Sequence, residues 1–162
     1  MIKETRTVNY DYSTVDPTLL EVFENPFPAN ADGVIHIEAP EFTSLCPKTG
    51  LPDFANIVID YLPDKLCLES KSYKIYLLSY RQHGEFHEGC VTRIFNDLTA
   101  AMKPKWIKVE GRFSPRGGIS FWPTVSTSDD VTPGGITFLT SDHVENFMKQ
   151  TDSPDDGSHK GS

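Results

Sequence analysis

Hydrophobic residues recur along the middle of the chain with two different periods. Alternation with polar residues, rich in β-branched and aromatic side chains, predicts strands, and spacings of three and four residues predict helices. The predicted elements are strands at 34–37 and 54–62 with a short continuation at 66–69, helices at 72–80 and 88–102, and strands at 106–113 and 119–122. This β-β-α-α-β-β order favours an α+β fold, an antiparallel four-stranded sheet with two helices on one face.

The two ends of the chain lack these patterns. Residues 1–31 contain three prolines and little periodicity, so we expect an N-terminal arm that wraps the domain or a neighbouring subunit. Residues 126–162 are rich in Ser, Thr, Asp, Gly and Pro, which predicts an acidic, partly disordered extension. The folded domain is therefore predicted at 32–125, with a loop rich in proline and glycine at 42–52.

Composition and charge narrow the class of protein. The 162 residues, 38% hydrophobic, suffice for one compact domain. The formal charge of −8 argues against direct binding of nucleic acid. Seven acidic and two basic residues in 123–162 account for −5 of it, which leaves −3 for 1–122. A basic pocket for an anionic cofactor is therefore compatible with the folded part.

Segments that would place the chain outside the cytoplasm are not found in the sequence. No apolar run approaches the roughly 20 residues of a membrane span, and the N-terminus lacks the apolar stretch of a secretory signal. Three cysteines at scattered spacings do not suggest a disulfide framework. We therefore expect a cytoplasmic protein with free thiols and no membrane partner.

A cysteine and an aspartate lie close together in the sequence around the predicted loop. Cys46 stands among Pro, Gly, Thr and Ser residues, and Asp53 follows where the next strand begins. Lys48 would favour the thiolate, which is the nucleophilic form of cysteine. A carboxylate beside the sulfur can donate or accept a proton. The spacing alone leaves open the alternative of an inert, partly buried thiol.

Three basic residues are candidates for binding phosphate. Lys71 and Lys74 lie at i and i+3 near the start of a predicted helix, where backbone N–H groups also favour anions. Arg116, followed by two glycines, offers a fork-shaped donor. A solvated basic face and an ordinary hairpin turn are the respective alternatives.

Histidines and a cysteine at short spacing suggest either a metal site or a base-binding pocket. His83, His87 and Cys90 are possible zinc ligands, but glycines interrupt the helical face and no CxxC pair accompanies them. Alternatively, His87 and Glu88 point into a pocket, where a carboxylate can accept two N–H donors from a purine-like edge. No GxGxxG follows a strand, so a nicotinamide cofactor would not bind through a Rossmann unit.

Four segments together resemble the 7-cyano-7-deazaguanine reductase family (preQ1 synthase, QueF), in its short single-module form. They are Phe42–Phe54, Glu69–Tyr76, His83–Glu88 and Gly111–Ile119, in family order and spacing within residues 33–122. Each segment alone is weak evidence, but the set is specific. The stretch Glu69–Tyr76 matches the signature that separates these reductases from zinc-dependent GTP cyclohydrolase I.

The resemblance implies roles for ten residues. Cys46 would be the nucleophile that forms a covalent thioimide, and Asp53 would be the proton donor. Substrate contacts would come from Leu68, Glu69, Ser70, His87 and Glu88, and contacts to the NADPH phosphates from Lys71, Lys74 and Arg116. No metal is implied. One departure from the family is Leu51, which stands where glutamine is usual.

The resemblance also implies a reaction, a fold and an assembly. Two NADPH would reduce the nitrile of 7-cyano-7-deazaguanine to the amine, a step in the synthesis of the tRNA nucleoside queuosine. The family has the tunnelling fold, so we expect a homo-oligomer of two stacked pentamers with active sites between subunits. The alternatives are a zinc-dependent, cyclohydrolase-like pterin enzyme of the same fold and a non-catalytic purine-binding module.

Overall fold

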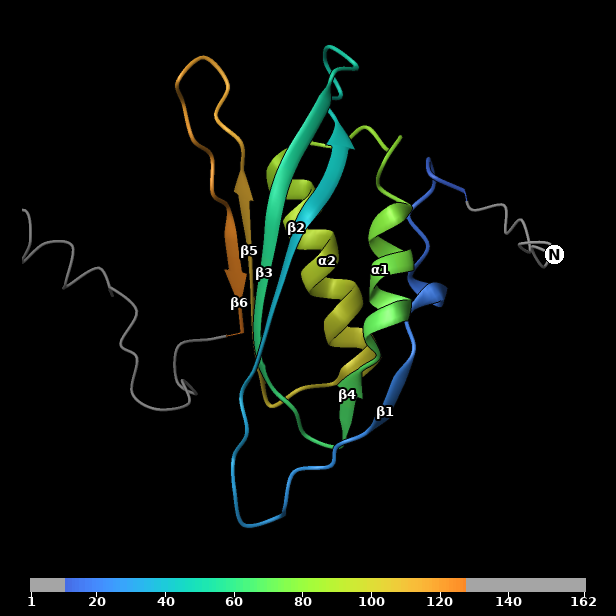
Figure 1. Ribbon diagram of the computed structural model, residues 1–162, viewed down its shortest axis with the longest axis vertical. Helices are drawn as coiled ribbons and strands as arrows, with labels where there is room; N and C mark the ends of the chain where they lie inside the picture. The colour runs from blue at the N-terminus through green and yellow to red at the C-terminus, as the bar shows by residue number, and fades with distance from the viewer. Residues whose placement is uncertain (1–10, 128–162) are drawn as a thin grey trace, which may run out of the picture.

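The computed structural model describes residues 11–127 as a sheet with two helices on one of its faces (Figure 1). The sheet consists of β2 (Ile35–Leu45), β3 (Pro52–Leu62), β5 (Trp106–Phe113) and β6 (Thr124–Ser126), in that order and antiparallel throughout. The helices are α1 (Ser70–Leu78) and α2 (His87–Met102). The predicted α+β architecture is confirmed. None of the described helices is long and apolar enough to span a membrane.

The core lies between α2 and the sheet because both elements present one apolar face. The helix contributes a fully buried stripe, and the central strands β3 and β5 contribute alternate residues that are equally buried. The residues are Val91, Ile94 and Leu98 on α2, Ile57 and Ile59 on β3, and Ile107 and Val109 on β5. Each such side chain stabilises the fold by roughly 1.5–3 kcal/mol relative to exposure. This packing fixes the start of α2 against the ends of the strands.

The N-terminal segment contributes regular structure, although its sequence shows little periodicity. It forms a short 3₁₀ helix, η1 (Pro17–Leu19), and β1 (Val22–Glu24), which pairs antiparallel with β4 (Leu66–Leu68). The N–H of Glu69 donates to the carbonyl of Glu21 at 2.9 Å. These contacts hold the segment beside α1, as the ribbon shows (Figure 1). Residues 1–10 lie outside the described residues, as does the predicted extension apart from its first two residues.

The strand predicted at 34–37 is much longer in the structure, and the loop predicted from residue 42 is wrong in its first part. β2 continues to Leu45 because an irregularity between Ala39 and Phe42 absorbs Pro40. Beyond it, Phe42 and Ser44 are both buried and pair with β3. The connecting loop is therefore only residues 46–51, which brings the site cysteine close to the end of a rigid strand.

The last strand begins later than the predicted 119–122. Gly117 and Gly118 adopt φ angles of 58° and 80°, a region that glycine enters without strain. They form a turn in which Arg116 and Ile119 exchange two backbone hydrogen bonds of 3.1 and 3.0 Å. The chain regains strand pairing only at β6, so apolar residues in 119–122 face outward instead of entering the sheet.

Candidate active site

A tight turn between β2 and β3 presents Cys46. The N–H of Cys46 donates to the carbonyl of Leu51, and the N–H of Gly50 donates to the carbonyl of Cys46, both at 2.8 Å. The preceding residue, Leu45, bonds on both sides to the segment before α2, through the carbonyl of His83 and the N–H of Glu85. Cys46 is therefore held in one place relative to the first residues of α2.

The thiol of Cys46 is the only one of the three with a lowered pKa. The Thr49 side chain, then the backbone N–H groups of Lys48 and Thr49, and then Arg116 bond to the sulfur and lower its pKa from 9.0 to about 6. Lys48 thus acts through its backbone. Burial raises the pKa of Cys67, and it raises that of Cys90 to about 12. Cys46 is the thiol poised as a nucleophile at neutral pH.

Selective alkylation tests this difference. The rate of Cys46 modification by iodoacetamide is expected to rise with pH through a midpoint near 6, since the thiolate is the reactive form. Thr49→Val removes the strongest bond to the sulfur and should shift that midpoint upward. Peptide mass mapping assigns the modified cysteine, and Thr43→Val on β2 serves as the control. A Cys46 midpoint near 8.5, an ordinary thiol value, would contradict the assignment.

Asp53 lies at the start of β3, just after the turn that carries Cys46. It is only 4% exposed. One carboxylate oxygen, Oδ1, forms an ion pair with Nη2 of Arg116. The other, Oδ2, lies 3.3 Å from Nε2 of His87 but accepts no hydrogen bond. A buried carboxylate oxygen without a donor is uncommon.

His87 and Glu88 enter the same site from the first turn of α2. The ring of His87 stacks on Phe113 with centroids 3.7 Å apart and an interplanar angle of 9°. Its Nε2 lies 2.9 Å from Nη2 of Arg116. The segment before the helix is anchored by Glu85, whose carboxylate accepts bonds of 3.0 and 3.2 Å from Arg93. The imidazole is therefore fixed from both the sheet and the helix.

These groups line one open cavity of about 360 Å³. Its polar lining is Cys46, Asp53, His87, Glu88, Ser114 and Arg116, and its apolar lining includes Phe86, Ile119 and Phe121. A nucleophile, a carboxylate and four further hydrogen-bonding groups thus converge beside an apolar wall. This combination suits covalent attack on a flat, partly polar ligand with nearby proton transfer.

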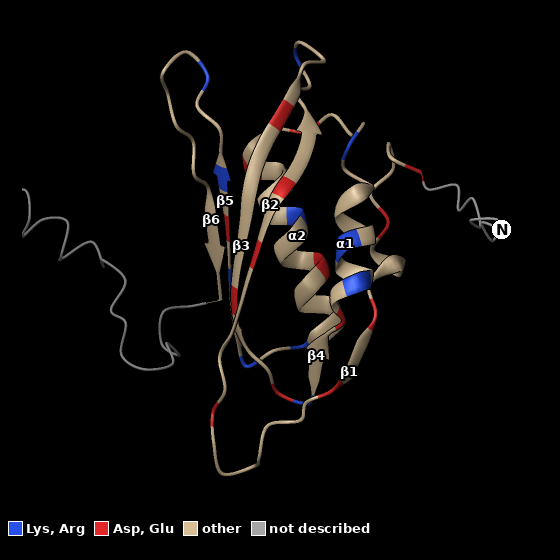
Figure 2. Cartoon of the chain, viewed as in Figure 1, with Lys and Arg blue, Asp and Glu red and all other residues tan. Residues whose placement is uncertain are grey.

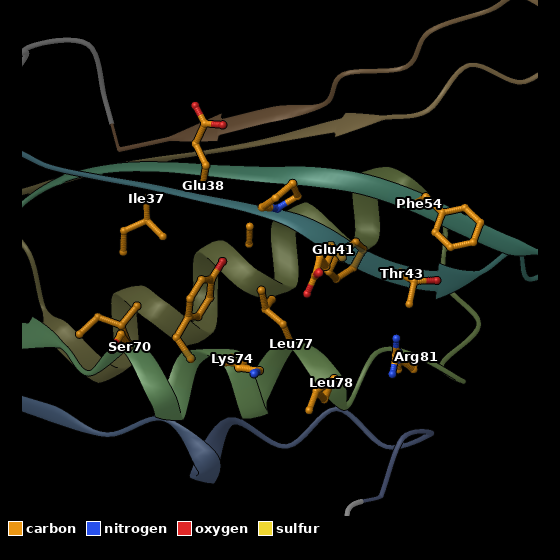
Figure 3. Close-up of a pocket in the computed structure, with 15 residues that line it drawn as sticks. Ile37, Glu38, Glu41, Thr43, Phe54, Ser70, Lys74, Leu77, Leu78 and Arg81 are labelled. Carbon is orange, nitrogen blue, oxygen red and sulfur yellow. The ribbon is translucent and has the colours of Figure 1, made fainter.

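A second cavity, of about 790 Å³, lies between α1 and β2 (Figure 3). Leu68, Ser70 and Lys74 line it, and its charged lining consists of two basic residues, Lys74 and Arg81, and two acidic ones, Glu38 and Glu41. Lys71 and Lys74 account for the basic side chains on α1 (Figure 2). The two cavities share no lining residue. Within one chain, Lys71 and Lys74 are therefore not brought together with Arg116.

Glu69 has a structural role that its sequence position did not suggest. Its carboxylate caps α1, accepting from the N–H groups of Lys71 at 2.9 Å and Ser72 at 2.6 Å. These bonds lower the pKa of Glu69. They also occupy the backbone donors that were expected to favour a phosphate at this helix start. The lysine side chains remain as the phosphate-binding candidates.

Two contributors to the site were missed from the sequence. Thr49 bonds to the Cys46 sulfur, and a hydroxyl three residues after a loop cysteine was a usable signal. Phe113, predicted only as a strand residue, supports the His87 ring. Among the residues that the structure describes, no three His, Cys, Asp or Glu side chains are arranged to hold a metal ion. His83 instead bonds to Glu85 at 3.1 Å.

The fold and this cysteine–carboxylate cavity define a tunnelling-fold protein with the groups for covalent catalysis. Residues 52–132 match the family model described as QueF-like protein, and the chain belongs to that family. It is 54% identical over 114 residues to the NADPH-dependent 7-cyano-7-deazaguanine reductases of Bacillus cytotoxicus and Bacillus mycoides. Each match covers 70% of this chain and 67% of the relative.

A solved structure shares the fold. The apo crystal structure of the archaeosine synthase QueF-Like aligns with a TM-score of 0.55 and 21% sequence identity. The alignment covers 58% of this chain and 92% of that one. At this identity the likeness concerns the fold, and it agrees with the predicted tunnelling fold.

Proposed function

We propose that this chain catalyses the NADPH-dependent reduction of 7-cyano-7-deazaguanine to 7-aminomethyl-7-deazaguanine, for queuosine synthesis. The observation that carries the proposal is the convergence of an activated thiol, Cys46, and a buried carboxylate, Asp53, in one cavity. The reductases named for this reaction are 54% identical over the same region. The cysteine and the aspartate are the residues to which we assign the chemistry.

The proposed reaction begins at the sulfur. The Cys46 thiolate adds to the nitrile carbon, and Asp53 gives a proton to the nitrile nitrogen, which forms a neutral thioimide. NADPH then supplies two hydrides in succession. The first, together with one proton on nitrogen, gives a thiohemiaminal, which expels the Cys46 thiolate and leaves an iminium ion. The second hydride reduces this iminium ion to the amine. Covalent addition divides one difficult reduction into two easier steps.

The substrate's polar edge would be bound by residues beside the nucleophile. Glu88 lines the Cys46 cavity, where its carboxylate can accept two N–H donors from the deazaguanine edge. His87 lines the same cavity, with Nε2 3.3 Å from Oδ2 of Asp53. We also assign substrate contacts to Leu68, Glu69 and Ser70, at the start of α1.

The cofactor's phosphates would be bound by basic side chains. Lys74 lines the larger cavity, and Lys71 lies one helical turn before it on α1. Their ammonium groups suit a phosphate because they are positively charged donors. They are the donors left there, since Glu69 occupies the backbone N–H groups of Lys71 and Ser72. Arg116, which lines the other cavity, would be the third basic residue that binds the phosphates.

This separation supports a homo-oligomeric site. If Ser70 and Glu88 contact one substrate, and Lys74 and Arg116 one cofactor, the α1 cavity of one copy has to face the Cys46 cavity of another. The rim of the Cys46 cavity is apolar and exposed at Phe86, Ile119 and Phe121, as expected of a surface that another chain covers. We propose two stacked pentamers.

Native mass spectrometry and small-angle scattering test the assembly. The expected result is a decamer, ten times the 18.2 kDa chain mass. Phe121→Asp, at the exposed rim, should dissociate it and reduce turnover together, because the site would lose its second half. Val34→Asp, at another exposed apolar position, is the matched control. A fully active monomer would contradict the shared site.

Intact mass spectrometry tests the proposed function directly. The protein is mixed with 7-cyano-7-deazaguanine in the absence of NADPH and weighed. One adduct of substrate mass is expected, and NADPH should discharge it with release of the amine. A folded protein with a reduced thiol that forms no adduct would restrict the likeness to the fold and would make metal content and pterin substrates the next measurements.

A further inference from the structure

Arg116 was assigned to the cofactor, but in the structure it lies against the catalytic groups. Its Nη2 pairs with Oδ1 of Asp53 and lies 2.9 Å from Nε2 of His87. The guanidinium also bonds to the Cys46 sulfur. The side chain is about half exposed and extends from a glycine-rich turn. It can therefore leave these partners without disturbing the core.

The position of Arg116 decides which nitrogen of His87 carries a proton. A guanidinium only donates hydrogen bonds, so Nε2 of His87 has to accept from it and be unprotonated. The same Nε2 lies 3.3 Å from Oδ2 of Asp53, which only accepts when ionised. One nitrogen cannot serve both neighbours. Oδ2 accordingly has no hydrogen-bond donor in the structure.

The arginine also occupies the carboxylate oxygen that the proposed chemistry needs. Oδ1 of Asp53 is paired with the guanidinium, whereas a free carboxyl oxygen has to reach the nitrile nitrogen to give it a proton. Cys46, as thiolate, is a second anion against the same guanidinium. Glu88 in the cavity and the buried thiol of Cys90 are the other titratable groups near the carboxylate. Withdrawal of the guanidinium frees Oδ1 of Asp53 and removes the basic side chain from the described lining of this cavity.

We propose that Arg116 is a positioning residue that keeps the empty site inactive, covering Oδ1 of Asp53 and holding His87 as the Nδ1–H tautomer until the guanidinium moves away. Once it leaves, the proton of His87 can move to Nε2, which lies beside Oδ2, and Oδ1 is open to the substrate. This proposal rests on the proposed function for the identity of the acceptor. The hydrogen bonds and the His87 tautomer that it assigns are those of the ligand-free protein.

Solid-state ¹⁵N NMR of histidine-labelled protein at pH 8 tests the proposal, because it separates protonated from unprotonated ring nitrogens in an assembly of any size. His87→Gln identifies the signals among the five histidines. In the unmodified protein, Nε2 of His87 should be unprotonated. In Arg116→Gln the proton should move to Nε2. Arg112→Gln, which removes an arginine of similar exposure paired with Glu110, should leave the spectrum unchanged.

A second measurement uses the sulfur contact. Arg116→Gln should slow iodoacetamide modification of Cys46 at pH 6 by about three- to tenfold, the effect of losing one nearby positive charge, and Arg112→Gln should not. Protonated Nε2 in the unmodified protein, a His87 spectrum that Arg116→Gln does not change, or an unchanged alkylation rate each overturns the proposal. Neither measurement needs the nitrile or NADPH, so failure here is distinct from failure of the proposed reaction.

Discussion

Cys46→Ala is expected to abolish turnover, with a loss of at least about 10⁴-fold, because an enzyme that lacks its nucleophile keeps only the binding contribution to catalysis. The substrate adduct should disappear from the intact mass spectrum at the same time. Noncovalent binding of 7-cyano-7-deazaguanine should survive, since the proposed base contacts come from Glu88 and its neighbours and not from the sulfur. Steady-state kinetics and isothermal titration calorimetry measure the two effects separately.

The matched control is Cys67→Ala. Cys67 is buried in β4, and its pKa is raised, so it should neither react with the nitrile nor contribute to turnover. If the Cys46→Ala protein still turns over, the reaction does not need the covalent step. If binding and cellular function both survive in Cys46→Ala, the non-catalytic purine-binding alternative would be favoured instead.

Much of the fold could be predicted because its core elements follow one period without interruption. The stripe on α2 and the alternation on β5 have no competing signal, and the bounds of β5 were predicted as 106–113. Prediction failed where tertiary contacts override local chemistry. The predicted strand at 34–37 stopped short of Pro40, yet the irregularity in β2 accommodates this proline and pairing resumes at Phe42.

The site shows the same division between local and long-range information. Cys46 and Asp53 are close because a tight turn joins two adjacent strands, so their spacing in the sequence was enough to predict this proximity. Arg116 comes from a turn more than 60 residues away, and only the pairing of β3 with β5 brings it to Asp53. The carboxylate of Glu69 bonds to N–H groups of its own helix, but glutamate is not among the residues preferred as helix N-caps, so the sequence did not indicate this role. An assignment based on the family signature did not reveal it.

Asp53→Asn is expected to lower turnover by about 10²- to 10⁴-fold, the usual contribution of a general acid. An amide of the same shape can still accept a bond from Arg116 at Oδ1, so the turn and the cavity should persist, but it has no proton to give to the nitrile nitrogen. Thioimide formation without NADPH should slow by a similar factor, because addition of sulfur leaves a nitrogen anion that nothing neutralises. Stopped-flow absorbance of the adduct and steady-state kinetics measure both.

Asp60→Asn is the control on the same strand, since Asp60 pairs with His36 on the surface far from the cysteine turn. It should retain turnover, while Asp53→Asn should not. Unchanged adduct formation in Asp53→Asn with slow turnover would place the role of Asp53 in the hydride steps. Unchanged rates in both measurements would mean that another group in the cavity donates the proton. Glu88, the other carboxylate of the lining, would be the residue to replace next.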